Sequence, residues 1–372
     1  MLVAFLAAVC SAVAQGETPH VVKVATPPPL ETLPMSIHGR FEAKASAGLD
    51  LPGFPKQDIV SQWPGAYYQA AFQGDAVYFR VGAAHEILHV VVDKRTLVLD
   101  KPEPGVYEVT GLSGRKHRVS IYVATESMSN PNHFGGFALA AGAKPLVVVV
   151  LPRQIEFIGD SHTVGFGNTS AKRECSDEEI WSTTDNTQTF AALTAARLHA
   201  NYEVNAISGR GIVRNYSGFP ADTLPEAYPY VLFDKAQKVD EPDWNPQLIV
   251  IALGTNDFST ALHAGEKWKS RDELHADYEA TYVRFLQDLR ARNPHAYFIL
   301  WATNLADGEI AAEEQRVVDR MRASGEQNIG FLEFKHLALS GCAGHPSVAD
   351  DRTISKALVR YVKAHPGIFR GE

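Results

Sequence analysis

Residues 154–167, QIEFIGDSHTVGFG, join an apolar strand pattern to a turn that carries a serine. The run Gln154–Ile158 is rich in β-branched and aromatic side chains and predicts a strand, which ends at Gly159-Asp160-Ser161. A serine on a strand-to-helix turn exposes its hydroxyl, while its own N–H and the helix N-terminus face developing negative charge. Ser161 is therefore a candidate nucleophile, although a Gly-Asp-Ser triplet alone is more often an ordinary turn.

Downstream of this stretch, apolar strands alternate with amphipathic helices. Residues 248–253 form a continuous apolar run, as expected for a strand buried on both faces of a parallel sheet. Residues 272–292 carry apolar side chains three and four positions apart, which predicts a helix, and a strand at 296–302 and a helix at 354–365 follow. The pattern predicts a three-layer α/β/α domain over residues 151–372, with ligands at the carboxyl ends of its strands.

Upstream, the pattern has a period of two. Residues 76–123 contain five short segments rich in β-branched and aromatic residues, separated by turn formers. No helical pattern interrupts residues 36–150, so we expect an antiparallel β-sandwich of jelly-roll type there. The proline-rich leader, residues 15–35, predicts an extended tether.

The N-terminus has the composition of a targeting segment. Leu2–Val13 is almost entirely apolar and ends in Ala12-Val13-Ala14, which predicts a signal peptide, residues 1–14, cleaved after about Ala14. The run is too short to cross a bilayer as a helix, and the alternative is a buried N-terminal strand. Export to the periplasm or the medium would permit a disulfide between Cys175 and Cys342, but two independent cysteines remain an equal alternative.

Chain length and net charge limit the classes of function that the sequence supports. The 372 residues are enough for two domains, and 35 Lys and Arg against 43 Asp and Glu make a net charge of −8. This charge argues against a surface that binds nucleic acid or an anionic membrane, and it favours neutral substrates. Cysteine and histidine spacings typical of a metal site are absent from the sequence, so we expect no metal.

Three further segments follow predicted strands or precede the last helix. Gly209 comes after a strand and has no side chain to block its N–H, although such a glycine is more often a plain turn. Asn256 and Asp257 follow residues 248–253; Asn256 could donate to an oxyanion and Asp257 could brace the loop, or both could form an Asx-turn. His345 is followed by proline, which suits a histidine held as a general base.

These four segments, in this order, resemble the four blocks of the SGNH, or GDSL-type, hydrolase superfamily over roughly residues 153–368. The details are similar to carbohydrate esterase family 2, the acetyl-xylan-esterase-like enzymes, which place a jelly-roll-like β-sandwich ahead of the hydrolase domain. The segments that carry this closer likeness are Gly165–Gly167, Ser208–Gly211, Gly341–Ser347 and the upstream segments His38–Phe41, Trp63–Gly65, Phe72–Gly74 and Thr125-Glu126.

The resemblance implies roles for the motif residues. Ser161 would be the nucleophile and His345 the general base, and the N–H groups of Ser161 and Gly209 with the Asn256 side chain would form the oxyanion hole. Asp160 and Asp257 would support the site, and no cofactor is implied.

Many members of the superfamily have aspartate three residues before the histidine, where this chain has Cys342. The resemblance then implies a Ser–His dyad whose imidazole is held by a backbone carbonyl. A second departure is Ala343-Gly344, where larger residues are usual, and it predicts either a wider site or a shifted substrate preference.

The resemblance predicts a secreted carbohydrate O-acetyl esterase that releases acetate from acetylated polysaccharides of the xylan or glucomannan type. Two alternatives remain: a GDSL-type lipase or thioesterase that uses the same four blocks, and a carbohydrate-binding protein whose aromatic cleft holds glycan without turnover. We expect the chain to act as a monomer, with the acetylated glycan as its partner and with neither nucleic acid nor membrane bound.

Overall fold

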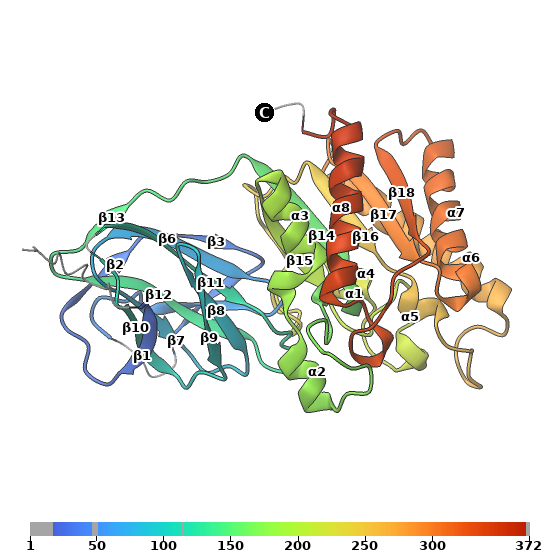
Figure 1. The fold of residues 1–372 in the computed structure, drawn as a ribbon. Coiled ribbons are helices and arrows are strands. Elements are labelled where there is room, and N and C mark those ends of the chain that lie inside the picture. The colour runs from blue at the N-terminus through green and yellow to red at the C-terminus, as the bar shows by residue number, and fades with distance from the viewer. Residues whose placement is uncertain (1–17, 47–50, 114, 370–372) are drawn as a thin grey trace, which may run out of the picture.

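The computed structural model describes residues 18–46, 51–113 and 115–369. The predicted signal peptide, residues 1–14, lies outside these residues. The described chain consists of two β-sheets packed face to face, followed by a parallel sheet covered by helices on both faces (Figure 1). The predicted order of a β-sandwich and an α/β domain is therefore confirmed. Within the described residues, no helix is long and apolar enough to span a membrane.

The two sheets of the N-terminal domain are antiparallel and enclose an apolar core. The first sheet has the order β1 (His20–Val24), β10 (Gly105–Thr110), β7 (Val77–Val81), β12 (Asn132–Ala140), β5 (Gln57–Ser61) and β4 (Glu42–Ala45), and β2 (Leu30–Leu33) also pairs with β12. The second has the order β13 (Lys144–Leu146), β6 (Tyr67–Gln73), β11 (Lys116–Val123), β8 (Ile87–Val92) and β9 (Arg95–Asp100), and β3 (Met35–His38) also pairs with β6. The core between the sheets contains Phe72, Phe79, Val90, Ile121 and Phe137.

The leader differs from its prediction as a tether. Strand β1 pairs with β10 and β2 pairs with β12, so residues 20–24 and 30–33 belong to the sandwich. Leu30 and Leu33 are buried while the two residues between them are exposed, and this burial holds the segment in place. The prolines at 27–29 only connect the two strands, and a short proline tract was therefore a poor guide to the whole leader.

The C-terminal domain is built on a parallel sheet of the order β15 (Ala200–Ala206), β14 (Arg153–Gly159), β16 (Leu248–Ala252), β17 (Tyr297–Thr303) and β18 (Ile329–Phe334). Helices α6 (Arg271–Arg292) and α7 (Glu309–Ala323) cover one face, and α3 (Phe190–Leu198) and α8 (Val348–Ala364) cover the other. Successive strand residues point to opposite faces of the sheet. In β14, Ile158 packs into the core under α6 and α7, and Phe157 packs into the core under α3 and α8. Because β15 and β16 flank the first strand, the chain order reverses at β14, and sheets of this kind bind ligands beyond the carboxyl ends of the strands at such a point.

The shorter helices lie in the loops that follow the strands. They are α1 (Ser161–Val164), α2 (Asp177–Thr183), α4 (Leu224–Ala227), α5 (Thr255–Phe258) and the 3-10 turns Asn186–Gln188, Tyr216–Gly218, Ala306–Gly308 and Cys342–Gly344. Figure 1 shows α1, α2 and α5 toward the lower end of the α/β domain. The loops that carry the sequence motifs are therefore gathered at one end of the sheet.

The two domains share a buried interface. The Arg40 guanidinium lies over the rings of Trp63 and Tyr228, with its Cζ atom 5.0 and 4.2 Å from the ring centroids, and it donates to the Tyr228 carbonyl. Trp63, from the sandwich, is itself part of the apolar cluster of the α/β domain. The Tyr202 N–H donates to the Tyr67 hydroxyl across the same interface at 3.3 Å. These contacts fix the sandwich against the α/β domain.

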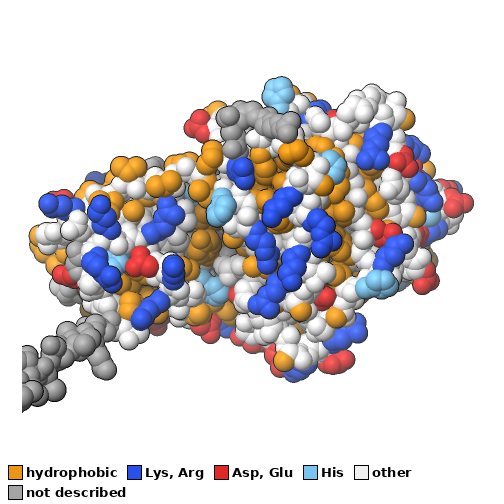
Figure 2. All heavy atoms as spheres, turned by 45° about the horizontal axis from the view of Figure 1, so that its top comes forward, with side chains coloured by type: hydrophobic (Ala, Val, Ile, Leu, Met, Phe, Trp, Pro, Cys, Tyr) orange, Lys and Arg blue, Asp and Glu red, His pale blue; other side chains and the backbone are white. Residues whose placement is uncertain are grey.

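Charge is distributed unevenly over the surface. Helix α8 bears exposed cationic side chains along its outer face, and Lys and Arg side chains are prominent on the face shown in Figure 2. These residues of α8 are Arg352, Lys356, Arg360 and Lys363. The chain therefore has a net charge of −8 overall, although the outer face of α8 is locally basic.

Candidate active site

Ser161 lies at the carboxyl end of β14, on the turn into α1. Asp160 caps this helix, since its carboxylate accepts the His162 N–H at 3.0 Å. Gly159 is required for the turn, because a Cβ atom there would lie 2.0 Å from the Thr163 hydroxyl oxygen. Ser161 is thereby placed just beyond the carboxyl end of the sheet, where it is 5% exposed.

The structure brings His345 to Ser161. The imidazole Nε2 lies 2.8 Å from the Ser161 Oγ, and Nδ1 lies 2.9 Å from the Cys342 carbonyl oxygen. Because a carbonyl only accepts, Nδ1 carries the proton and Nε2 is free to accept from the serine hydroxyl. Burial lowers the pKa of His345 below its usual 6.5, and the bond to the Cys342 carbonyl offsets part of this shift. The neutral form that can accept a proton is therefore favoured.

Three carboxylates of the C-terminal segment that could orient a histidine have other partners. Asp350 accepts from the Ser347 N–H in the capping box of α8, and Asp351 accepts from the Phe190 N–H at 2.9 Å. Glu333 forms an ion pair with Lys335 at 3.1 Å. Among the described residues, no carboxylate is hydrogen-bonded to His345, and its second nitrogen meets a backbone carbonyl.

The loop that carries His345 is covalently anchored. Cys342 forms a disulfide with Cys175, 167 positions earlier, which decides between the two alternatives left open by the sequence. The Cys342 N–H also donates to the Gly167 carbonyl at 3.2 Å, and the Ala343 N–H to the Arg173 carbonyl at 2.7 Å. A Cβ atom at Gly167 would lie 2.4 Å from the Cβ of Cys342, so this position admits only glycine. The glycine after the serine motif thus makes room for the histidine loop.

Gly209 follows β15 and adopts a φ of +79°, which favours glycine. Among the described residues, the N–H groups of Gly209 and Ser161 donate to no protein acceptor. Both lie in loops at the carboxyl ends of neighbouring strands, β15 and β14, which pair in parallel. They are available donors for a bound oxygen atom.

Asn256, at the start of α5, connects the first three motifs. Its Nδ2 donates to the Asp160 Oδ2 at 3.0 Å and to the Arg210 carbonyl at 2.8 Å. These two bonds use both amide hydrogens, so Asn256 holds the serine turn and the Gly209 loop together in this structure. It presents no unused donor in this arrangement.

Asp257 braces the loop after Gly209 from below. Its carboxylate accepts the consecutive N–H groups of Ile212, Val213 and Arg214 at 2.9 to 3.0 Å. Burial raises the pKa of Asp257 to about 6 and that of Asp160 to about 7, with these hydrogen bonds acting in the opposite direction. Both supporting carboxyl groups are therefore buried beneath the motif loops.

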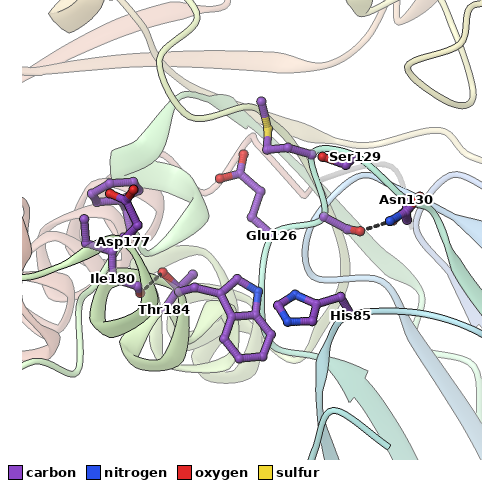
Figure 3. Close-up of a pocket in the computed structure, with 11 residues that line it drawn as sticks. His85, Glu126, Ser129, Asn130, Asp177, Ile180 and Thr184 are labelled. Atoms are coloured by element: carbon purple, nitrogen blue, oxygen red, sulfur yellow. Dashed lines mark hydrogen bonds between the residues drawn. The ribbon is translucent and has the colours of Figure 1, made fainter. Parts of the chain in front are cut away.

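A pocket of about 420 Å³ lies between the two domains beside this site. Its walls come from the sandwich loops at His85 and 126–130, from Phe166, and from α2 with the residue that follows it: Asp177, Ile180, Trp181 and Thr184. Figure 3 shows Glu126 between Ile180 and Asp177 on one side and Ser129 on the other. The Phe166 ring, whose centroid is 4.4 Å from that of His345, links the pocket to the motif residues.

Sequence reasoning assigned no role to Glu126, although it noted the Thr125-Glu126 pair. A carboxylate three residues after the end of β11 was the available signal, but only the packing of the two domains places Glu126 next to Ser208 and Gly209. In the part of the chain that the structure describes, no group of three or more His, Cys, Asp or Glu side chains is arranged to hold a metal ion.

Both domains of the chain match known protein families. Residues 54–148 match the carbohydrate esterase 2 N-terminal family, and residues 157–366 match the GDSL-like lipase/acylhydrolase family. An acetylxylan esterase/glucomannan deacetylase of Cellvibrio japonicus is 41% identical over 339 residues, which cover 91% of this chain and 92% of that protein.

Solved structures agree along nearly the whole length. A carbohydrate esterase studied for the divergent catalytic and non-catalytic binding functions of its active site is 40% identical, with a TM-score of 0.85 and coverage of 91% of this chain and 99% of that one. A family two carbohydrate esterase from Clostridium thermocellum in complex with cellohexaose is 25% identical, with a TM-score of 0.75 and coverage of 90% and 100%. The sandwich and the α/β domain therefore occur together, in this order, in these relatives.

Proposed function

This chain belongs to carbohydrate esterase family 2 and is a carboxylic ester hydrolase, and from that premise we propose that it is a secreted, monomeric enzyme that releases acetate from acetylated xylan or glucomannan. The name of the Cellvibrio japonicus relative supports the substrate class, and the apolar N-terminal segment supports export. The cellohexaose held by the Clostridium thermocellum structure supports a β-linked glycan as the bound polymer.

The observation that carries the chemistry is the 2.8 Å contact between the Ser161 hydroxyl and the His345 Nε2. In the proposed mechanism, His345 accepts the serine proton as the hydroxyl oxygen attacks the acetyl carbonyl carbon. The protonated imidazole then donates that proton to the departing sugar oxygen, which leaves an acetyl-serine. The same imidazole then deprotonates a water molecule, whose oxygen attacks the acetyl carbon. Acetate leaves as the imidazolium returns the proton to the Ser161 oxygen.

The Cys342 carbonyl orients the His345 imidazole, which is one of the roles of aspartate in a catalytic triad. It accepts the Nδ1 proton at 2.9 Å and so keeps the imidazole in the tautomer that can act as a base. Since a carbonyl carries no full charge, it stabilises the imidazolium less than a carboxylate would. We therefore propose a Ser–His dyad whose orientation depends on the backbone of the 342–345 turn.

The oxyanion of the tetrahedral intermediate would be bound by the N–H groups of Ser161 and Gly209. Asn256 would become a third donor by exchanging its bond to the Arg210 carbonyl for one to the oxyanion. Its bond to Asp160 would hold the amide plane during this exchange. In this proposal the third donor is engaged only when negative charge develops, so that it favours the transition state over the bound ester.

The test compares acetate release from acetylated xylan, p-nitrophenyl acetate and a long-chain p-nitrophenyl ester. We expect turnover of both acetyl esters, little turnover of the long-chain ester, and complete loss in Ser161→Ala with the fold retained by circular dichroism. Preference for the long-chain ester would favour a lipase instead. Glycan binding without turnover of any ester would reject the proposal and favour a binding protein.

A further inference from the structure

Glu126 reaches from the sandwich into the loops of the α/β domain. It lies just after β11, and its Oε1 accepts the Ser208 N–H at 2.7 Å. This hydrogen bond joins residues 82 positions apart, and its length is at the short end of the usual N–H···O range. Ser208 is the residue directly before Gly209, so the bond restrains the Ile207–Ser208 peptide, one unit before the Ser208–Gly209 peptide that carries the Gly209 N–H.

The segment that bears Glu126 is itself held rigidly between the domains. The Ala124 N–H donates to the Ile87 carbonyl at 2.9 Å, the Ala124 carbonyl accepts the Asn186 N–H at 2.8 Å, and the Thr125 hydroxyl accepts the Ile87 N–H at 3.1 Å. The restraint therefore originates in a backbone that is anchored to both domains. It is not a flexible surface side chain that meets the loop by chance.

Hydrogen bonds within the α/β domain also hold the Gly209 loop. The Gly209 carbonyl accepts the Tyr216 N–H at 2.9 Å, and the Arg210 N–H donates to the Ile207 carbonyl at 3.3 Å. Below the loop, Asp257 holds residues 212–214, and Asn256 holds the Arg210 carbonyl. On the Ser208 side, Glu126 supplies the side-chain bond to the peptide N–H. Gly209, with its positive φ and without a Cβ atom, depends on its neighbours for a fixed orientation.

We propose that Glu126 is a positioning residue for the esterase reaction: through Ser208 it fixes the Gly209 N–H that binds the oxyanion. This inference rests on the proposed function. It assigns the sandwich a part in transition-state stabilisation, because a residue of that domain sets the geometry of a donor in the other. Misplacement of such a donor by about 1 Å can cost on the order of 10²-fold in rate.

The test uses three single variants and p-nitrophenyl acetate, which lacks a sugar that could contact the pocket. Glu126→Ala removes the acceptor, Glu126→Gln keeps a side-chain oxygen that can accept from Ser208, and Glu31→Ala removes an exposed carboxylate on strand β2 of the same domain. We expect kcat to fall about 10- to 100-fold in Glu126→Ala with little change in KM. Glu126→Gln should recover kcat to within about three-fold of the wild type, and Glu31→Ala should match the wild type.

Amide hydrogen exchange of a peptide that covers residues 207–211 gives a readout that needs no turnover. Exchange should accelerate in Glu126→Ala and remain near the wild-type rate in Glu126→Gln. The inference is overturned if folded Glu126→Ala keeps kcat within about two-fold, if its exchange is unchanged, or if Glu126→Gln is as impaired as Glu126→Ala. A wild-type chain that releases no acetate would reject the proposed function alone, since the exchange experiment still reports on the restraint.

Discussion

Removal of the Cys175–Cys342 disulfide should lower stability far more than turnover. The bond closes a loop whose ends are 167 positions apart. In the chain-entropy description, a loop of this length restricts the unfolded state by about 5 kcal/mol at 25 °C, and measured values are commonly about 2–4 kcal/mol. For a domain of this size, each kcal/mol corresponds to about 2–4 °C in Tm. A decrease of about 5–20 °C is therefore expected.

Turnover should survive because the disulfide does not contact the reacting atoms. His345 is oriented by the Cys342 backbone carbonyl, which alanine also provides. The turn retains its bonds from the Cys342 N–H to Gly167 and from the Ala343 N–H to Arg173. We expect kcat at 25 °C to stay within about three-fold of the wild type, which is under about 1 kcal/mol in activation free energy.

The measurement uses the double variant Cys175→Ala, Cys342→Ala, which has no free thiol from either position. Calorimetry gives the Tm of the transition that includes the α/β domain, and p-nitrophenyl acetate gives kcat well below it. Wild-type protein reduced with dithiothreitol is the control, because its thiols fill the same volume without the covalent bond. A folded variant with kcat reduced more than about ten-fold would refute the argument that backbone bonds suffice, and an unchanged Tm would refute the entropy argument.

Three further predictions concern the site. The value of kcat/KM should fall at acid pH with an apparent pKa below 6.5, because burial lowers the pKa of His345 and only the neutral imidazole accepts the serine proton; an acid limb centred above 7 in a pH–rate profile would contradict this. Asn256→Ala should reduce kcat about 10²–10³-fold in steady-state assays of a folded variant, whereas a near-normal kcat would mean that the two backbone donors suffice. Gly167→Ala should destabilise the protein by about 1–3 kcal/mol in thermal unfolding, because φ is +56° and Cys342 fills the space of the new Cβ atom. Gly142→Ala is its control, since Gly142 has a φ of +94° and nothing within 4 Å of the added atom, and equal losses in the two variants would assign the effect to φ alone.

The motif residues could be found from the sequence because they follow local patterns. Gly159-Asp160-Ser161, Gly209 and Asn256 each come just after an apolar run, and parallel strands bring their carboxyl ends to one edge of a sheet. The resemblance to carbohydrate esterase family 2 was also present in the order and spacing of these motifs, and the matches to that family confirm it. The leader was mispredicted because three consecutive prolines outweighed the short apolar segments on either side.

Sequence by itself determined the two kinds of domain, their order and the candidate chemical groups, because periodicity and strand-end motifs are properties of neighbouring residues. Tertiary structure decided which distant groups meet: Cys175 with Cys342, the His345 Nδ1 with a carbonyl in place of a carboxylate, and Glu126 with the loop of another domain. The disulfide and the Glu126 contact join segments that are far apart along the chain. The contact of His345 with the Cys342 carbonyl depends on the backbone conformation of one turn. Their geometry follows from how sheets and loops pack in three dimensions, which local residue patterns do not encode.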